Sequence, residues 1–221
     1  CTYLPTGQKI LFFGLDDPGK LKSLKLPFGA VGLCWFEELD QFDGPEEVRN
    51  VEQTVLRGGS WTLEDGTLVG RNRENCPGMI ISRQDFSGPV MLDFEARTIP
   101  PCTHDINCMW SGSWDYETNT RALAYVVGLE GWWDGKVGFE KSPEYKLNCG
   151  TQLLNFEPGW YYHVQCGSIG GHIFCVIDGA LALEVMDPDP IDQGRYGKVG
   201  FEAYCSQIQI RKFSVKRLFY T

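Results

Sequence analysis

Short segments of alternating or wholly apolar residues, separated by turn residues, recur along the chain and constrain its fold more than any other feature. Examples are SWTLE, TLVGR, PVMLDFEARTI, HIFCVI and ALALEVM. The 26 glycines and 12 prolines fall mostly between such segments. Many short strands with Gly-rich turns are typical of sandwiches and barrels. We therefore predict an all-β fold, a jelly-roll sandwich of two antiparallel sheets, and one domain over residues 1–221.

Two Asp-Gly pairs mark tight hairpins. Asp65-Gly66 separates SWTLE from TLVG, and Asp178-Gly179 separates HIFCVI from ALALEV. Asp and Gly tolerate the positive φ values of the two-residue turn that matches the twist of paired strands. We therefore predict a β-hairpin at each pair.

The hexapeptide GKVGFE occurs twice, at residues 135–140 and 197–202. The sequences around the two copies differ, with LEGWWD before one and DQGRY before the other, which argues against a duplicated unit. In each copy Val and Phe lie two residues apart and share one strand face, while Lys and Glu fall on or beside the opposite face. We expect two short strands, each with an apolar inner face, that satisfy the same local structural requirement.

The chain is acidic, with 29 Asp and Glu against 20 Lys and Arg and a net charge of −9. Nucleic acid and anionic lipid reward basic patches, so the charge argues against both as partners and leaves neutral ligands such as carbohydrates. Nine scattered cysteines show no metal-site spacing, and several lie in apolar runs. This pattern predicts reduced, buried thiols and a cytoplasmic protein. The alternative is an exported lipoprotein whose mature chain starts at Cys1.

The segment PVMLDFEARTI predicts a strand with a charged row on one face. Its apolar residues at positions 90, 92, 94 and 96 point one way, whereas Asp93, Glu95 and Arg97 point the other. Such a row fits a binding face, with Glu95 as a candidate catalytic residue and Arg97 as a candidate ligand contact. The alternative is a solvated outer face with cross-strand ion pairs.

The stretch PPCTHDINCMWSGSWDYETNT places His, Asp and Trp close together near loops, which often carry function. His104 could act as a base, Asp105 could orient it, and Trp110 could stack on a ligand. The alternative is a loop capped by Asp105, with Trp110 in the core.

The stretch YVVGLEGWWDGKVGFEKSPEY predicts a strand that ends at Glu130, followed by a loop. Neighbouring side chains on a strand point to opposite faces, so we expect at least one of Trp132 and Trp133 at a rim. Exposed aromatic rings suit the apolar faces of sugars, although a protein interface is the alternative. We predict Glu130 as a catalytic base and Tyr125, Trp132, Trp133 and Lys141 as ligand contacts.

The acidic loop MDPDPIDQG could offer oxygens from Asp187, Asp189 and Asp192 to calcium. Its spacing and ligand number match no established metal motif, and a Pro-stiffened, solvated loop is the alternative. We therefore predict no cofactor and no required metal, with calcium as the ion this loop could take.

Several segments follow one another in an order that resembles that of a known protein family. They are SWTLEDGTLVGR, MIISRQDFSGPVMLDFEARTI, EPGWYYHVQCGSIGGHIFCVIDGALALEVMDPDP and GRYGKVGFEAYCSQIQIRKFSVKRL. The order is similar to the bacterial concanavalin A-like sandwich family of 3-keto-disaccharide hydrolases, over residues 60–218. The C-terminal part also resembles galectin-like bacterial proteins of unknown activity found among pectin-utilisation genes. Residues 1–59, expected to hold short strands and an acidic loop, depart from the family pattern.

The resemblance implies a galectin-like or concanavalin A-like sandwich, with Glu95 and Arg97 at polar positions of the family's charged strand. It also implies an enzyme that cleaves a glycoside, for example one oxidised to a 3-keto sugar. There a base such as Glu130 or His104 would remove the acidic proton at C2, and Arg97 or Lys141 would stabilise the enolate. A non-catalytic sugar-binding module and a structural or partner-binding sandwich are the two alternatives.

Overall fold

The computed structural model describes residues 2–3, 8–9, 59–72, 77–131, 136–144, 146–147, 149–152 and 156–219. The chain divides into two compact units, residues 1–55 and 56–221. In the first unit β1 (Thr2–Tyr3) pairs with β2 (Gln8–Lys9) in antiparallel register. The acidic loop expected in residues 1–59 lies outside the described residues, so the single domain over the whole chain stays a prediction.

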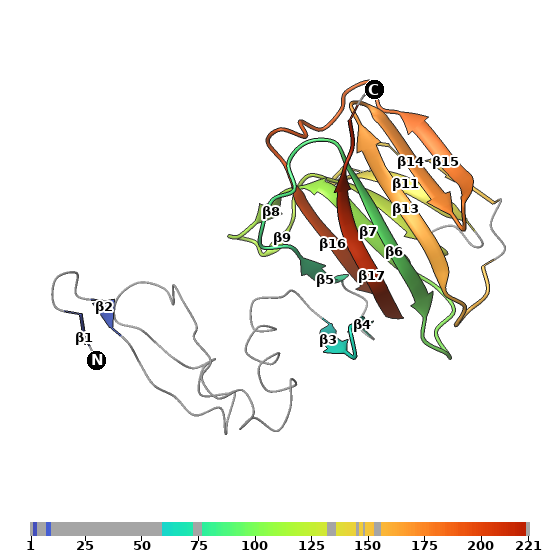
Figure 1. The fold of residues 1–221 in the computed structure, drawn as a ribbon, viewed down its shortest axis with the longest axis horizontal. Coiled ribbons are helices and arrows are strands. Elements are labelled where there is room, and N and C mark those ends of the chain that lie inside the picture. Colours follow the sequence, from blue (N-terminus) through green and yellow to red (C-terminus); the bar gives the residue numbers. More distant parts are fainter. Residues whose placement is uncertain are drawn as a thin grey trace. The chain divides into compact units, whose positions relative to one another are not determined.

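The second unit is a sandwich of two antiparallel sheets (Figure 1). One sheet has six strands, in the order β12 (Cys149–Thr151), β11 (Val137–Ser142), β10 (Ala124–Leu129), β7 (Ile106–Gly112), β16 (Lys198–Tyr204) and β5 (Pro77–Ile81). The other has seven, in the order β15 (Ala180–Met186), β14 (His172–Ile177), β13 (Tyr162–Ile169), β6 (Val90–Thr98), β17 (Gln207–Arg217), β4 (Thr67–Arg71) and β3 (Ser60–Glu64).

A small ribbon of β8 (Trp114–Asp115) and β9 (Thr120–Arg121) interrupts the connection from β7 to β10. All strand pairs in the described residues are antiparallel, and these residues contain no helix. The predicted all-β sandwich is confirmed. Nor does the described part contain a helix long and apolar enough to cross a membrane.

The core lies between the two sheets and follows the alternation predicted for β6. Val90, Leu92, Phe94 and Ala96 are buried, and the residues between them are half-buried. Phe94 meets Phe201 of the six-stranded sheet edge to face, with ring centroids 5.1 Å apart. Full burial of an apolar side chain of this size contributes about 1.5–3 kcal/mol, so these contacts hold the two layers together.

Both predicted hairpins are present. β3 and β4 are joined by Asp65-Gly66, with φ values of 46° and 75°, and β14 and β15 by Asp178-Gly179, with 49° and 81°. Positive φ at both central residues is what the two-residue turn requires.

The two GKVGFE copies form β11 and the first part of β16, both in the six-stranded sheet. Val137, Phe139, Val199 and Phe201 are buried in the core, as predicted. β10 and β7 lie between the copies, and each neighbouring pair is antiparallel, so the two copies run in opposite directions.

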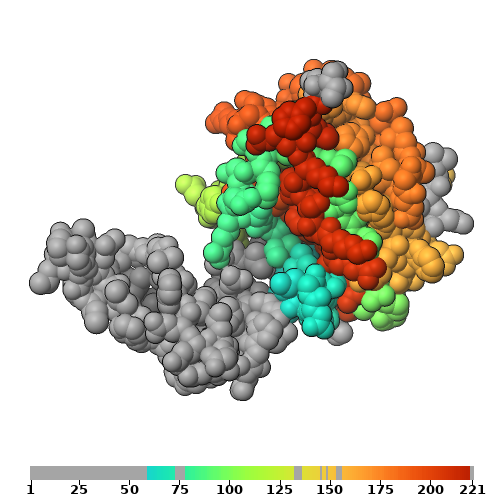
Figure 2. Space-filling view, in the orientation of Figure 1, coloured from blue at the N-terminus to red at the C-terminus, as the bar shows by residue number. Residues whose placement is uncertain are grey.

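The outward faces of the two sheets differ. The six-stranded sheet is buried on this side as well, where Met109, Ala124 and Val126 form a second apolar cluster. The seven-stranded sheet instead carries charged pairs. Figure 2 looks onto this sheet, in which β17 (red) runs beside β6 (green).

The described cysteines are free. Cys108, Cys166 and Cys175 are buried in the core as predicted, whereas Cys102 and Cys149 are half-buried and Cys205 is exposed. Burial raises the pKa of the Cys166 and Cys175 thiols well above the ordinary value. Raised pKa values lower the fraction of reactive thiolate. These thiols therefore act as small apolar side chains.

Gly167→Ala tests how closely β13 approaches β6. A Cβ at Gly167 would overlap the backbone oxygen of Val90 and lie 2.8 Å from the Met91 Cα. Because backbone atoms cannot move aside, we expect a loss of about 1–3 kcal/mol in the free energy of unfolding, measured by urea titration. Gly194→Ala is the control, since its Cβ would meet only the Asp192 carboxylate at 3.2 Å. Equal losses in both variants would contradict the close approach.

Candidate functional site

The two GKVGFE copies each place a glutamate on the outward face of the six-stranded sheet, and both glutamates bind one arginine. Arg121 Nη1 lies 2.7 Å from Glu202 Oε2, and Arg121 Nη2 lies 3.2 Å from Glu140 Oε1. Arg121 Nε donates to Ser142 Oγ at 3.1 Å. The Arg121 side chain is 9% exposed. This buried ion-pair network is the centre of the candidate site.

The β8–β9 ribbon positions Arg121. Trp114 pairs with Arg121 across the ribbon, and Asp115 closes its turn by accepting hydrogen bonds from Glu117 N at 2.8 Å and Thr118 Oγ1 at 2.6 Å. These bonds hold the Asp115 carboxylate in its ionised form, so its pKa lies below the ordinary value. The ribbon is therefore locally stabilised and presents Arg121 to the sheet.

Asp105 and Glu130 lie side by side at the other end of the site. Asp105 N donates to Glu130 O at 3.0 Å, which extends the ladder between β7 and β10 by one bond. Both residues have left-handed backbones, with φ values of 74° and 53°. Such conformations are costly for residues with side chains and are common at functional sites. Asn107 Nδ2 donates to Asp105 Oδ1 at 2.6 Å and joins Asp105 to the sheet. Asp105, Asn107, Arg121, Glu140 and Glu202 are called the acidic cluster below.

Several buried acceptor atoms of this region have no hydrogen-bond partner. They are Asn107 Oδ1, Glu140 Oε2, Glu130 Oε2 and the Ser111 hydroxyl oxygen. Asn107 and Glu140 are each only 1% exposed. Buried polar atoms are nearly always paired in proteins, so these acceptors are available for a further hydrogen-bond donor.

Two carboxyl groups of the acidic cluster have perturbed pKa values. Burial, reinforced by the charges of Glu202 and Glu140, raises the pKa of Asp105 to about 7. Burial also raises the pKa of Glu140 to about 7, although Arg121 acts in the opposite direction. Because these groups interact, they titrate as a set. Carboxyl groups that exchange protons near neutral pH are typical of sites that bind or transform ligands.

Glycines occupy the sheet next to the cluster. Asn107 of β7 lies between Glu202 of β16 and Gly128 of β10, and the row continues through Gly138 and Gly150. No side chain projects from these three positions on the outward face. The polar side chains of Asn107 and Glu202 are therefore flanked on this row by bare backbone.

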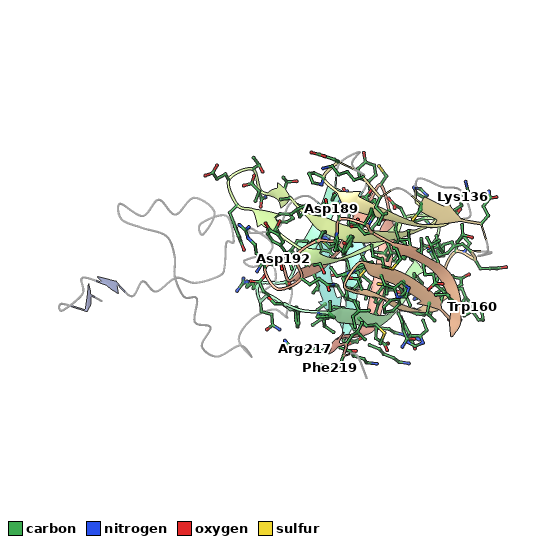
Figure 3. The ribbon with its side chains drawn as sticks, turned by 90° about the horizontal axis from the view of Figure 1, so that it is seen from above. Lys136, Trp160, Asp189, Asp192, Arg217 and Phe219 are labelled. Atoms are coloured by element: carbon green, nitrogen blue, oxygen red, sulfur yellow. The ribbon has the colours of Figure 1, made fainter. Side chains whose placement is uncertain are left out.

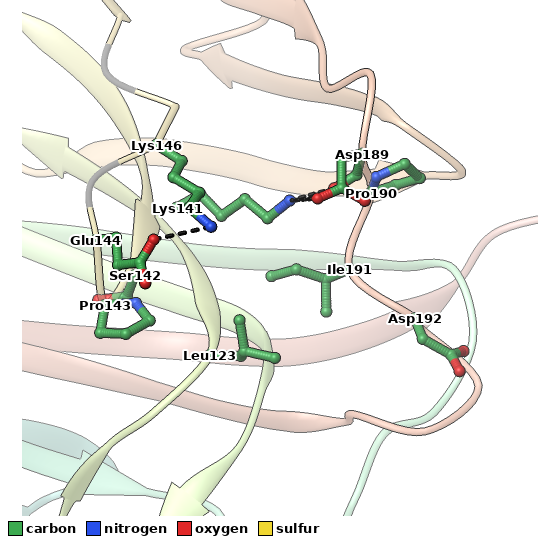
Figure 4. Close-up of a pocket in the computed structure, with 10 residues that line it drawn as sticks. All are labelled: Leu123, Lys141, Ser142, Pro143, Glu144, Lys146, Asp189, Pro190, Ile191 and Asp192. Atoms are coloured by element: carbon green, nitrogen blue, oxygen red, sulfur yellow. Dashed lines mark hydrogen bonds and ion pairs between the residues drawn. The ribbon is translucent and has the colours of Figure 1, made fainter.

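A pocket of about 220 Å³ adjoins the cluster at Ser142 (Figure 4). Its apolar walls come from Leu123, Pro143, Pro190 and Ile191. Its polar rim carries two ion pairs, Lys146 with Glu144 at 2.8 Å and Lys141 with Asp189 at 3.7 Å. We call it the Lys141 pocket. Its volume is below that of pockets for drug-sized ligands, about 300–1,000 Å³, and suits a single small ring.

The structure brings together part of the predicted site. Asp105 and Glu130 lie beside each other, as described above. His104 precedes Asp105 but is exposed, and its Nδ1 lies 3.5 Å from Thr103 Oγ1. Lys141 lines the pocket and pairs with Asp187 at 3.0 Å.

Trp110 and Tyr125 lie in the core, between the sheets. Trp110 has no exposed surface and its Nε1 donates to Ser168 Oγ at 2.9 Å. The Tyr125 hydroxyl donates to Asp187 Oδ2 at 2.8 Å and accepts from Ile191 N at 2.9 Å. Burial raises the pKa of Tyr125. Fully buried rings with satisfied polar atoms cannot stack on a ligand, so we assign both to packing.

Glu95 and Arg97 point outward from the seven-stranded sheet, on the other layer of the sandwich from the acidic cluster. Glu95 binds Arg211 at 2.6 Å and Lys212 at 2.7 Å, and these bonds lower its pKa. A carboxylate held ionised by two cations is a poor proton acceptor. Arg97 Nε donates to Gln209 at 2.7 Å, and its guanidinium lies over Tyr161. Cross-strand pairing is therefore the better interpretation of this charged row.

Trp132 and Trp133 lie outside the described residues, so their predicted contact with a ligand stays a prediction. Arg121, Glu140 and Glu202 were not predicted as site residues. The repeated hexapeptide carried a signal for both glutamates, because it placed each on the polar face of its strand.

The acidic loop between β15 and β16 forms ion pairs and hydrogen bonds with other groups of the protein. Asp187 binds Lys141 and Tyr125, and Asp189 N donates to Asp187 Oδ1 at 2.9 Å. Figure 3 shows Asp189 and Asp192 at separate positions along this connection. In the described part of the chain no group of three or more His, Cys, Asp or Glu residues is arranged to hold a metal ion.

Comparison with solved structures assigns the fold. A protein of unknown function with a galectin-like fold from Bacillus subtilis matches with a TM-score of 0.59 and 15% identity, over 79% of this chain and 92% of that one. A carbohydrate binding module from Bacillus subtilis matches with a TM-score of 0.57 and 11% identity, over 73% and 93%. A sialidase matches with 0.53 and 12%, over 76% of this chain and 17% of the sialidase. The second unit is thus a galectin-like β-sandwich, as predicted, and these identities establish the fold alone.

The N-terminal segment is similar to a different protein. Residues 2–62 match the family model of the phage terminase large subunit. The chain is 46% identical to the terminase large subunit of Bacillus phage SPP1 over 56 residues. This stretch is 25% of this chain and 13% of the phage protein. The family match ends inside β3, so nearly the whole sandwich lies beyond it. The resemblance found in the sequence began at residue 60 and did not include this segment.

Asp105→Asn should make stability less dependent on pH. The folded chain holds the Asp105 proton up to about pH 7, whereas the ordinary pKa is 3.8. Between these values the folded state binds more protons, so the free energy of unfolding falls as the pH rises. Asparagine keeps the acceptor for Asn107 and has no charge to bury. In urea titrations we expect equal stability near pH 4 and a more stable variant at pH 8, by at most about 4 kcal/mol at 1.36 kcal/mol per pKa unit.

The control for this series is Asp189→Asn, because the Asp189 side chain is 94% exposed. Its effect should stay small at both pH values. A stability difference for Asp105→Asn that is the same at pH 4 and pH 8 would show that the carboxyl is not buried as described.

Arg121→Ala should be strongly destabilising at pH 8, because it leaves Glu140 and Glu202 buried without their cation. Removal of one partner from a buried ion pair costs about 3–5 kcal/mol. Lys146→Ala is the matched control, since Lys146 and Glu144 form an exposed pair that should contribute less than about 1 kcal/mol. Urea titration of both variants measures the difference. Similar small losses would mean that the Arg121 network is not formed.

Proposed function

We propose that the β-sandwich of residues 56–221 binds a carbohydrate at the acidic cluster and the adjoining Lys141 pocket. The observation that carries the proposal is the pair of unpaired, buried acceptors on the outward face of the six-stranded sheet, Asn107 Oδ1 and Glu140 Oε2. The small pocket with apolar walls begins at Ser142, two residues after Glu140 on β11. Sugar hydroxyls can donate to such oxygens, and the C–H faces of a sugar ring can pack on Pro143 and Ile191.

The fold supports the same class of ligand. One of its structural relatives is a carbohydrate binding module, and another is a sialidase. These relatives resemble this chain in fold alone, so the choice of ligand rests on the acidic cluster and the pocket. The proposal concerns the sandwich and assigns no activity to the terminase-like segment.

Cleavage of a glycoside is a second candidate function, favoured by the raised pKa values of Asp105 and Glu140. A carboxyl group that is partly protonated at neutral pH can protonate the leaving oxygen while water attacks the anomeric carbon. For a 3-keto glycoside, Glu130 or His104 would instead remove the C2 proton, and the aglycone would leave from C1 by elimination. Both routes need a proton-transfer group within reach of the sugar.

Binding is tested by calorimetric titration of the full chain with neutral tetrasaccharides of glucose, xylose and mannose. We expect saturable binding of at least one of them, and about tenfold weaker binding by Asn107→Ala, since one hydrogen bond to a buried group is worth about 1.4 kcal/mol. Gln165→Ala is the control, because Gln165 lies on β13 of the other sheet and binds Asp93.

Failure of every tetrasaccharide to bind would overturn the carbohydrate proposal and favour a partner-binding sandwich. Binding that Asn107→Ala leaves unchanged would move the site elsewhere. Release of p-nitrophenol from aryl glycosides or their 3-keto forms, lost in Glu140→Gln or Glu130→Gln, would establish cleavage.

A further inference from the structure

The acidic cluster holds more negative than positive groups. Asp105, Glu140 and Glu202 converge on it, since the charges of Glu140 and Glu202 both act on Asp105. Within the described residues, Arg121 is the cation that contacts these carboxyl groups. Lys141, the next residue to Glu140, pairs with Asp187 instead. Lys136 lies at the periphery of the domain (Figure 3).

The unpaired atoms of the cluster are of one chemical kind. Asn107 Oδ1 and Glu140 Oε2 can accept hydrogen bonds, and neither can donate when Glu140 is ionised. Both belong to side chains that are 1% exposed, so bulk water does not satisfy them. A group that pairs with these atoms is therefore a donor, and a positive charge on it would offset the excess of carboxylates when Asp105 and Glu140 are ionised.

We infer that the sugar bound at this site carries a free, protonated amine, as glucosamine does. The inference rests on the proposed carbohydrate function and names its substrate class. An ammonium group offers three N–H donors and one positive charge, whereas a hydroxyl offers one donor and no charge. A uronic acid would bring a fourth carboxylate to the cluster and is disfavoured.

The approach to the cluster is on the side of Glu130 and Gly131, which are half-buried. A Cβ at Gly131 would lie 2.9 Å from Asp105 Oδ1 and 3.9 Å from Asn107 Oδ1. The glycine thus lets the chain pass close to these two oxygens, with no side chain between them and residue 131. Glu130 Oε2, also unpaired, lies on the neighbouring residue and could accept from the same amine or from the adjacent hydroxyl.

The test compares tetrasaccharides that differ in one substituent: glucosamine, N-acetylglucosamine, glucose and galacturonate tetramers. Calorimetric titration of the full chain at low salt should give binding to the glucosamine tetramer about tenfold or more tighter than to the glucose tetramer, as for one charge-assisted hydrogen bond. The galacturonate tetramer should bind weakest. Added salt should reduce the preference for the amine.

Glu140→Gln is the decisive variant, since it removes one charge and keeps the shape. It should lower affinity for the glucosamine tetramer about tenfold and leave the glucose tetramer nearly unchanged. Glu184→Gln is the control for the general acidity of the chain, because Glu184 lies on β15 of the other sheet, where it pairs with His172. Thermal unfolding verifies that both variants fold, and the comparison of ligands on the unmodified chain stands without any variant.

The outcomes separate this inference from the proposed function. Equal affinity for the glucosamine and glucose tetramers, or preference for galacturonate, would overturn the amine and leave carbohydrate binding intact. An equal loss in Glu140→Gln and Glu184→Gln would also overturn it, because the attraction would then be non-specific. Absence of binding by all four tetramers would overturn both.

Discussion

The outward face of the six-stranded sheet depends on one contact, the Arg121 guanidinium between Glu140 and Glu202. Two carboxylates buried on neighbouring parts of a sheet repel each other and lose their hydration, so the sheet tolerates them only with a cation between them. The β8–β9 ribbon must therefore stay folded over the sheet. The same ion pairs join the ribbon to β11 and β16, whose spacing is set by the ladders of β10 and β7 between them.

Arg121 cannot compensate all the carboxyl groups that face it, and the surplus contributes to the chemistry of the site. Burial is the main reason why the pKa values of Asp105 and Glu140 are raised to about 7, and the neighbouring carboxylates add to it. A bound cation would favour the ionised carboxylates and release the protons. Proton uptake and ligand charge are thus two ways to satisfy one electrostatic requirement.

Local pattern was enough to predict the fold and the faces of β6, β11 and β16. The alternation in β6 gave its inner and outer residues, and two Asp-Gly pairs gave their hairpins. Pattern placed Glu95 on the outer face of β6 but could not identify its cation partner, because Arg211 is 116 residues away and the pairing depends on strand order. It also could not place Trp110 or Tyr125. β7 and β10 are buried on both faces, so their sequences show no alternation from which to choose a side.

The two copies of GKVGFE run in opposite directions about β7 and β10, so they are related by a local pseudo-two-fold axis. Each copy contributes one glutamate, and a half-turn about that axis exchanges them. The two strands by themselves therefore do not distinguish one end of the site from the other. Polarity comes from the connections, with Asp105 and Glu130 at one end and the Arg121 ribbon at the other. A ligand with unlike ends would be oriented by these connections and not by the repeated peptide.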